Sequence, residues 1–185
     1  DSSIGGKTGV DFDGYKNMVG AFKMPKLVYM NLATLLTVDN RQYFAGFAEV
    51  MKHGIIKDAK FYTWLIENMY EICEKDLDVL EEMVLKSCTI KKKVVEKDPL
   101  EQGERAILNF GHTIGHAIES SCMPQYYHGE AVGLGMLMIC EDETIRNRIR
   151  KCLNRLECPT DISFNAEELY EVLTMDKKAG KNTIS

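Results

Sequence analysis

Residues 108–119 read LNFGHTIGHAIE, and this stretch decides what kind of domain the chain forms. His112 and His116 are four residues apart, so on a helix they lie one turn apart on a face that continues to Glu119. Two or three histidines with a carboxylate are the usual ligands of a catalytic Zn²⁺ that keeps one position open. The spacing therefore favours a metal site with His112 and His116 as its first candidates. The alternative is a pair of ordinary histidines on a helix surface.

Two more residues extend this candidate site. His128 follows the next turn, so three of the four histidines fall between positions 112 and 128. Glu49 lies in the otherwise apolar segment 47–51, which reads FAEVM. If this carboxylate is buried, it has to be paired, protonated or bound to a metal. A helix ion pair with Lys52, three residues on, is the alternative to a metal ligand.

The chain on both sides of these residues has the pattern of a mostly helical domain. Apolar residues recur at helical spacing in several segments, which are separated by proline, glycine and capping residues. Residues 1–25 hold five of the 14 glycines and are expected to be rich in loops, and residues 27–30 to be a short strand or the end of a connecting segment. Helices are expected over residues 39–54, with Asp39 as N-cap and Gly54 as C-cap, and over 59–74, 76–97, 104–121, 129–149 and 166–175.

The composition is that of a globular protein with one full-sized core, since 45% of the 185 residues are hydrophobic and 28% are charged. A net charge of -5 argues against nucleic acid as the main partner. The longest apolar run, 131–140, is interrupted by glycine and is too short to span a membrane. The six cysteines form no CxxC pair, which predicts free thiols in a reducing cytoplasm.

One lysine falls on the apolar side of a predicted helix. Lys91 comes seven residues after Val84, so it lies on the apolar stripe of the segment 76–97 rather than opposite it. Lys92 and Lys93 have the pattern of a solvated face. Lys91 is therefore a candidate for binding an anion, and an ordinary surface charge is the alternative.

Further cations are placed where they could meet an anionic small molecule. Arg105 precedes Asn109 and His112 by four and seven residues, so all three would share a face of one helix. Lys7 and Lys16 lie in the glycine-rich segment. Together these residues predict a cationic pocket for a phosphate or carboxylate beside the metal site. Unrelated surface charges remain the alternative for each residue taken alone.

These motifs resemble those of the 3-dehydroquinate synthase family. The resemblance covers nearly the whole chain, as far as residues 176–178, and departs from the family at His53, where tyrosine is frequent. The turn before His128 is also slightly short. Five segments carry the resemblance in the order that the family has them: 1–11 (DSSIGGKTGVD), 14–22 (GYKNMVGAF), 44–54 (FAGFAEVMKHG), 108–119 and 128–132 (HGEAV).

The resemblance implies a protein in two parts, an N-terminal Rossmann-like domain that binds NAD and a mostly helical C-terminal domain. Residues 1–38 would be a glycine-rich interdomain segment that contacts NAD and substrate. Residues 39–185 would be the helical domain that binds the metal and most of the substrate. The NAD-binding domain is expected to be absent from these residues, and the chain alone is expected to be inactive. The full-length family enzyme is expected to be a cytoplasmic homodimer.

The resemblance also implies site residues. The metal, Zn²⁺ or Co²⁺, would be bound by Glu49, His112 and His128 rather than by the pair that spacing favours. Lys177 or Lys178 would close the pocket. The catalytic residues would be Lys7, Lys52, Asn109 and His116, with His116 as a hydrogen-bonding or proton-transfer group. The substrate would contact Asp1, Lys7, Asn17, Lys52, Lys91, Arg105, Asn109 and His116. NAD would contact Lys7, Lys16, Thr34, Leu35, Leu36 and Thr37.

The implied activity converts a phosphorylated keto acid, 3-deoxy-D-arabino-heptulosonate 7-phosphate, to 3-dehydroquinate and phosphate. NAD would take up a hydride, phosphate would leave, the hydride would return, and an intramolecular aldol reaction would close the ring. Three alternatives remain open. They are another sugar phosphate cyclase, a metal-dependent alcohol dehydrogenase, and a helical binding module with a structural metal or none.

Overall fold

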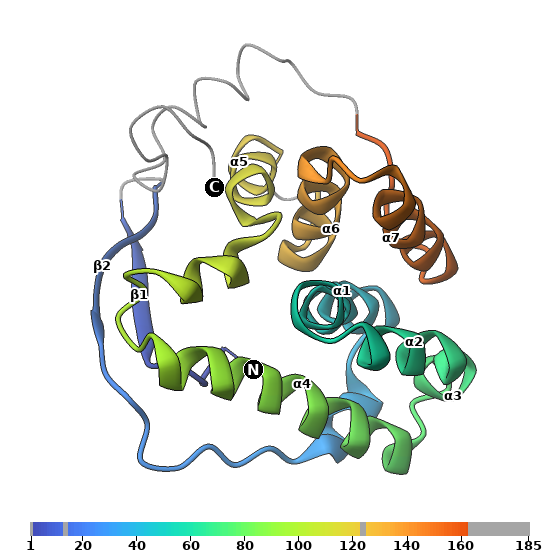
Figure 1. Ribbon diagram of the computed structural model, residues 1–185, viewed down its shortest axis with the longest axis horizontal. Helices are drawn as coiled ribbons and strands as arrows, with labels where there is room; N and C mark the ends of the chain where they lie inside the picture. The colour runs from blue at the N-terminus through green and yellow to red at the C-terminus, as the bar shows by residue number, and fades with distance from the viewer. Residues whose placement is uncertain (1, 13–14, 123–124, 163–185) are drawn as a thin grey trace. The chain divides into compact units, whose positions relative to one another are not determined.

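The computed structural model describes residues 2–12, 15–122 and 125–162, and these residues are mostly helical (Figure 1). The fold class predicted from the sequence is thereby confirmed. The chain divides into two compact units. Unit 1 comprises Asp1–Val38 and His53–Leu108, and unit 2 comprises Asp39–Lys52 and Asn109–Ser185.

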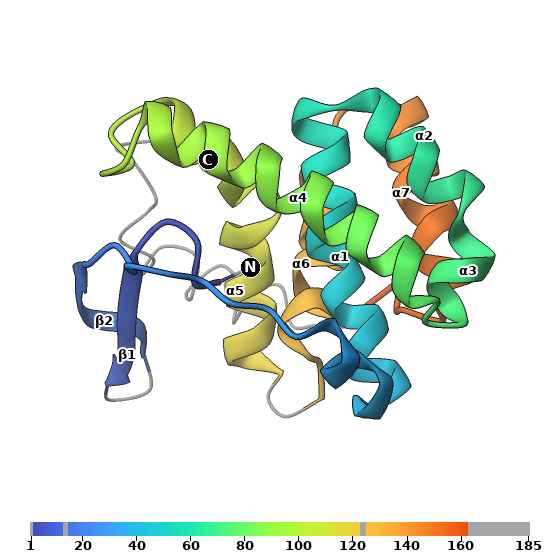
Figure 2. The ribbon, with the colours of Figure 1, turned by 90° about the horizontal axis from the view of Figure 1, so that it is seen from below.

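Unit 1 begins with a β-hairpin. Strand β1 (Lys7–Phe12) pairs antiparallel with β2 (Tyr15–Phe22), and Val10 lies opposite Val19 (Figure 2). The prediction of loops for this segment is therefore wrong. Both valines are exposed, so the hairpin lacks the alternation of buried and exposed residues that identifies a strand in a sequence.

A connecting segment follows the hairpin. Residues 27–30 form no strand, so they belong to the connection, which was one of the two predicted outcomes. The 3₁₀ helix η1 (Leu32–Thr37) comes next. It begins where the Asn31 side chain accepts a hydrogen bond from Ala33 N at 3.2 Å, which satisfies one of the backbone donors that a helix start leaves open.

The long helix of unit 1 agrees with its prediction. Helix α4 (Leu77–Lys97) is unbroken (Figure 2) and is capped by Asp76. Lys91 is half-buried whereas Lys92 and Lys93 are exposed, as the apolar stripe predicted. The buried residues of α4 are Leu80, Met83, Ser87, Val94 and Val95.

The single helix predicted over 59–74 is wrong, because the structure has two shorter helices. They are α2 (Ala59–Glu67) and α3 (Met69–Cys73). Asn68 separates them, and its side-chain amide donates a hydrogen bond to Trp64 O at 2.8 Å. Asparagine competes in this way with the helical backbone bonds and favours a helix end.

Unit 2 is a helical bundle. It contains the first part of α1 (Asn40–Lys57) together with α5 (His112–Ser121), α6 (His128–Ile139) and α7 (Glu143–Arg155). Helix α6 lies between α5 and α7 (Figure 1). All residues of α6 from 129 to 137 are buried, which is the pattern of a helix enclosed on every side.

A glycine allows α6 to approach α1 closely. A Cβ atom on Gly129 would lie 1.8 Å from Ala45 O, so no other residue fits without a shift of the backbone.

Burial of Ile118, which is fully buried, contributes about 1.5–3 kcal/mol from the hydrophobic effect. The cluster of buried apolar residues around it consists of Ala117, Ile118, Ala131 and Leu134.

Two of the predicted helices are broken near the site. The predicted helix over 104–121 is a 3₁₀ helix, η2 (Glu104–Asn109), followed by α5. Gly111 separates them with a φ of 77°, a left-handed conformation that glycine adopts without strain. The predicted helix over 129–149 is divided into two helices, α6 and α7. Asp142 caps the start of α7, where its side chain accepts a hydrogen bond from a backbone N–H of the first turn.

The ends of α1 agree only in part with the prediction. Asp39 accepts hydrogen bonds at the helix start, as predicted. Gly54 does not end the helix, which continues to Lys57. Its small size serves packing instead, because a Cβ there would lie 3.0 Å from Tyr62 N. The helix predicted over 166–175 lies outside the described residues.

In the part of the chain that the structure describes, no helix combines the length and the apolar character needed to cross a membrane. All six cysteines are free thiols, which agrees with the prediction.

Candidate metal centre

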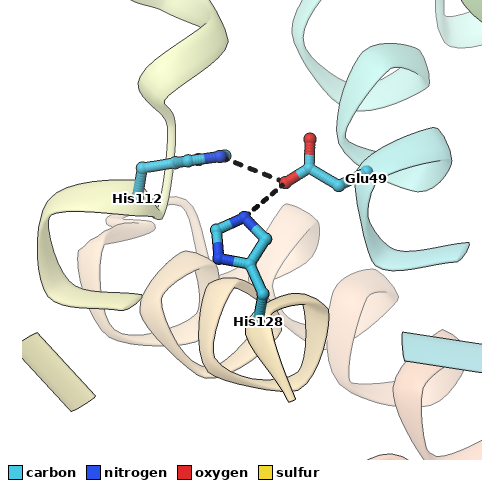
Figure 3. Close-up of side chains that lie close together, drawn as sticks. All are labelled: Glu49, His112 and His128. Carbon is cyan, nitrogen blue, oxygen red and sulfur yellow. Dashed lines mark ion pairs between the residues drawn. The ribbon is translucent and has the colours of Figure 1, made fainter. Parts of the chain in front are cut away.

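Three helices of unit 2 each supply one metal-binding side chain. Glu49 lies within α1, and His112 and His128 are the first residues of α5 and α6. One ligand atom from each side chain lies within 4.8 Å of those of the other two. Figure 3 shows both rings pointing at the same carboxylate oxygen. Among the described residues, no other group of three or more histidine, cysteine or acidic side chains is this compact.

The shared oxygen has no hydrogen-bond donor. Glu49 Oε1 lies 3.1 Å from His112 Nε2 and 3.9 Å from His128 Nε2. It is buried and makes no hydrogen bond, so the 3.1 Å approach lacks hydrogen-bond geometry. A buried oxygen without a partner costs about 1–3 kcal/mol. A cation between the three side chains would remove this cost.

The second nitrogen of each ring shows where its proton lies. His112 Nδ1 is 3.3 Å from Phe110 O, and His128 Nδ1 is 3.0 Å from Glu119 Oε2. Because a carbonyl or carboxylate oxygen only accepts, we assign the ring proton to Nδ1 in both histidines. Each Nε2 atom then carries a lone pair directed toward Glu49. Three lone pairs that converge in this way fit a divalent metal ion.

The electrostatics favour the protonation states that bind metal. Lys52 Nζ lies 2.7 Å from Glu49 Oε2, so the carboxylate has the ion pair considered from sequence and also faces the rings. Burial alone would raise the pKa of Glu49, but the neighbouring ammonium group of Lys52 opposes this effect and helps to hold the pKa well below its usual range. Burial lowers the pKa of His112, against the opposing effect of Glu49. An ionised Glu49 and a neutral His112 follow at neutral pH.

His116 lies beside the cluster without belonging to it. Its ring centroid is 5.5 Å from that of His112 and 5.6 Å from that of His128. The compact group contains Glu49 in its place. The structure therefore gathers the set that the family resemblance implies, and not the His112 and His116 pair that helical spacing favours.

Two family models together match nearly the whole chain. One, described as 3-dehydroquinate synthase C-terminal, matches residues 46–179, and the other, described as 3-dehydroquinate synthase N-terminal, matches residues 1–45. The chain belongs to the 3-dehydroquinate synthase family. The resemblance stated from the motifs is thereby confirmed.

Curated relatives give the same result. The 3-dehydroquinate synthase of Acetivibrio thermocellus is 46% identical over 96% of this chain and 52% of its own length. The 3-dehydroquinate synthase of Thermoanaerobacter pseudethanolicus is 42% identical over 100% of this chain and 55% of its own length. The chain therefore spans about half the length of the curated relatives it matches.

Two solved structures share the fold. A 2-deoxy-scyllo-inosose synthase, complexed with carbaglucose-6-phosphate, NAD⁺ and Co²⁺, has a TM-score of 0.81 at 27% identity over 100% of this chain and 53% of its own. A 2-epi-5-epi-valiolone synthase from Streptomyces hygroscopicus, with NAD⁺ and Zn²⁺ bound, has a TM-score of 0.86 over 94% of this chain and 51% of its own. The second is 23% identical, so it bears on the fold alone.

The remaining site residues implied for a 3-dehydroquinate synthase are divided between the two units. Lys52, Asn109 and His116 belong to unit 2 with the metal cluster. Lys7, Lys91, Arg105 and the four residues Thr34, Leu35, Leu36 and Thr37 belong to unit 1. Asp1, Lys177 and Lys178 lie outside the described residues, as do the side chains of Lys16 and Asn17.

Arg105 differs from its sequence-based placement. The interpretation that it shares a helical face with Asn109 and His112 is wrong, because the helix is interrupted at Gly111. Arg105 is 2% exposed. Its guanidinium donates hydrogen bonds to Pro99 O at 2.6 Å and to Gly5 O at 2.9 Å. It thus ties together segments of unit 1, and contact with substrate stays a prediction.

Lys7 also has a partner within unit 1, because its ammonium group forms an ion pair with Glu101. For Lys7 to bind the substrate as predicted, an anionic group of the substrate would have to replace the Glu101 carboxylate as its partner. Nothing in the sequence pattern indicated Glu101 as its partner.

Sequence reasoning missed two ionic contacts close to the metal ligands. Glu119 was noted on the face of α5 without a partner, and the structure pairs it with His128. Arg41 donates to both carboxylate oxygens of Glu130, at 2.7 and 2.8 Å. Glu130 follows His128 by two residues, and this closeness to a ligand was the one sign in the sequence that Glu130 could belong to the surroundings of the metal site.

Proposed function

We propose that the chain is the metal- and substrate-binding part of a 3-dehydroquinate synthase. The reaction would convert 3-deoxy-D-arabino-heptulosonate 7-phosphate to 3-dehydroquinate and phosphate. The observation that carries the proposal is the convergence of three lone pairs from Glu49, His112 and His128 in a member of this family. The protein would act as a cytoplasmic homodimer.

The proposed cofactors are NAD and one Zn²⁺ or Co²⁺ ion. When bound, the metal would supply a Lewis acid for the substrate hydroxyl that is oxidised, and NAD would supply the reversible hydride acceptor. The buried, donor-free Oε1 of Glu49 and the two Nε2 atoms fit a divalent metal. The likeness to a solved structure that contains NAD⁺ and Co²⁺, at 27% identity, supports this choice.

The residues around the metal have separate roles in this proposal. Lys52 pairs with Glu49 and helps to keep this carboxylate ionised, and it would contact the substrate. His116, beside both ligand histidines, would donate or accept a proton at a substrate oxygen. Asn109 would hydrogen-bond the substrate.

The cations that the resemblance implies would hold the substrate by its two ends. Lys7, Lys91 and Arg105 would bind its phosphate and carboxylate groups in one geometry. Thr34, Leu35, Leu36 and Thr37, with Lys7 and Lys16, would contact NAD. Asp1 and Asn17 would contact the substrate.

The metal assignment is tested by removing each ligand. In Glu49→Ala, His112→Ala and His128→Ala, the metal content measured by mass spectrometry should fall from about one ion per chain toward zero, because three ligands are needed for tight binding. Glu143→Gln is the matched control, since it removes one negative charge from an exposed position of the same unit. Metal content that survives all three alanine changes would show that the ligand assignment is wrong.

The activity is tested with the protein at its natural length. It should restore growth without aromatic amino acids to a bacterium that lacks 3-dehydroquinate synthase, and it should release phosphate from the heptulosonate phosphate. NADH should not accumulate, because the hydride is returned within the cycle. Net NADH formation would favour an alcohol dehydrogenase. Turnover of other sugar phosphates without turnover of this one would favour a different cyclase, such as the structural relative with 27% identity.

A further inference from the structure

We propose that Glu119 is a positioning residue of the metal centre. Its carboxylate fixes the tautomer and the rotation of the His128 ring and thereby raises the affinity of the site for the divalent metal. The inference rests on the proposed function, because it takes His128 to be a metal ligand.

The first argument is the contact itself. Glu119 Oε2 lies 3.0 Å from His128 Nδ1, which is the nitrogen that faces away from Glu49. Glu119 follows His112 by seven residues on α5, so both side chains lie on one face, two turns apart. One helix therefore carries a ligand at its first residue and the hydrogen-bond acceptor of the second ligand near its end. A histidine that binds a metal through one nitrogen commonly donates the other N–H to such an acceptor.

The second argument is the exposure of the ligands. The side chain of His128 is 45% exposed, whereas that of Glu49 is 22% and that of His112 is 14% exposed. Packing alone therefore restrains the His128 ring least. Glu119, with a side chain that is 10% exposed, is the buried partner that this ring needs.

The third argument is the contrast between the two histidines. His112 Nδ1 faces a neutral carbonyl, Phe110 O, at 3.3 Å, and His128 Nδ1 faces a carboxylate at 3.0 Å. A hydrogen bond to an ionised acceptor is about twice as strong as one between neutral groups. The Glu119 contact thus restrains the His128 ring more firmly than the carbonyl restrains the His112 ring, and it offsets the weaker packing of His128.

The backbone below His128 is held by other contacts. Gly129 packs against Ala45, and Glu130 accepts two hydrogen bonds from Arg41. These contacts fix the backbone at His128 but leave its side chain free to rotate. Loss of the Glu119 carboxylate should therefore change the metal site more than it changes the fold.

The test measures metal affinity in the protein with Glu119→Ala and Glu119→Gln. We expect Glu119→Ala to weaken Co²⁺ binding by about 10–100-fold, the usual effect of losing a partner behind a metal-bound histidine. Glu119→Gln should recover part of this loss, because its amide oxygen still accepts the Nδ1 proton but has no charge. Competition with a chelator gives the affinity, and the visible absorption of bound Co²⁺ reports the ligand geometry. Glu143→Gln should bind Co²⁺ like the wild type.

The possible outcomes separate this inference from the proposed function. Wild-type Co²⁺ affinity in Glu119→Ala, together with loss of binding in His128→Ala, would overturn the role of Glu119 and leave the metal site intact. Wild-type affinity in His128→Ala would overturn both. If Glu119→Ala lowers the free energy of unfolding of the metal-free protein and the loss of Co²⁺ affinity follows this loss of stability in both variants, Glu119 is only a structural residue. An affinity loss in Glu119→Ala that Glu119→Gln partly rescues, at unchanged metal-free stability, supports the inference.

Discussion

At the scale of single residues, the Cys158 thiol shows how the charges of unit 2 act on a neighbouring titratable group. Its side chain is largely buried, with 7% of the residue exposed. Burial and the Glu130 carboxylate raise the pKa of this thiol to about 11, against a smaller opposing effect of Arg41. The thiol therefore stays protonated well above neutral pH, and only a thiolate reacts as a nucleophile.

We predict that Cys158 reacts with iodoacetamide at about pH 8 much more slowly in the folded protein than in urea, where an ordinary thiol pKa of about 8.5 applies. The folded pKa is the higher one, so this thiol stabilises the fold at low pH, and its contribution is lost as the pH rises toward 11. Timed labelling followed by peptide mass spectrometry measures the rate. Equal rates in the folded and unfolded states would contradict the prediction.

The ligand residues show what a sequence can and cannot reveal at this scale. Glu49 was recognisable as a group in need of a partner because it interrupts an apolar segment. The structure places the Lys52 ammonium group at one of its oxygens, and the other oxygen faces the His112 and His128 rings. Helical spacing favoured His116 because it detects neighbours on one helix, whereas His128 comes from another helix. Such a contact depends on how helices pack, and motif matching alone indicated it.

At the scale of elements, α6 combines a buried body with an exposed ligand at its first residue. The helix can lie against α1 because Gly129 has no side chain where Ala45 O approaches. Gly46, in the next position of α1, is exposed and has nothing within 4 Å of an added Cβ. Gly129 therefore cannot be replaced without a shift of the backbone, whereas Gly46 has room for a side chain.

We predict that Gly129→Ala lowers the free energy of unfolding by at least about 1–3 kcal/mol, the usual cost of overpacking. It should also reduce the metal content, because His128 is the preceding residue. Gly46→Ala is the matched control and should stabilise the protein by up to about 1 kcal/mol, since alanine is the better helix former. Urea unfolding measures both. A neutral Gly129→Ala would show that α1 and α6 are less closely packed than the structure indicates.

The existence of most elements was predictable, and their breaks were not. Helix α4 has a capping aspartate and a regular apolar stripe, and both of its ends agree with the prediction. The break at Gly111 was missed because glycine within a helical pattern is often tolerated. The close approach of Met136, whose Cγ would lie 2.5 Å from a Cβ at this position, depends on helix packing that the sequence does not show. The hairpin was missed because its valines are exposed.

At the scale of the whole chain, the metal cluster connects segments that are distant in sequence. Its ligands come from α1, α5 and α6, which are brought together only when unit 2 is folded. The order of motifs was enough to identify the family, because it depends on sequence alone. The division into two units was not predictable, since α1 passes from Lys52 in unit 2 to His53 in unit 1 without a change in composition.

Because the ligands converge only in the folded state, metal binding should add its free energy to folding. At a free Zn²⁺ concentration one hundred times the dissociation constant, the gain is about 2.7 kcal/mol. For a chain of this size this corresponds to a rise in Tm of roughly 5–10 °C. Thermal unfolding followed by circular dichroism, with and without a chelator, measures the shift.

The part of the protein that the metal stabilises distinguishes binding at this specific site from binding at scattered surface positions. Hydrogen exchange should slow in α5 and α6, whose first residues are ligands, and both effects should be absent in Glu49→Ala. Glu143→Gln should keep them, because Glu143 is an exposed residue of α7. A rise in Tm that persists in Glu49→Ala would place the metal elsewhere in the protein. The cluster of Glu49, His112 and His128 would then be a set of close side chains without a metal.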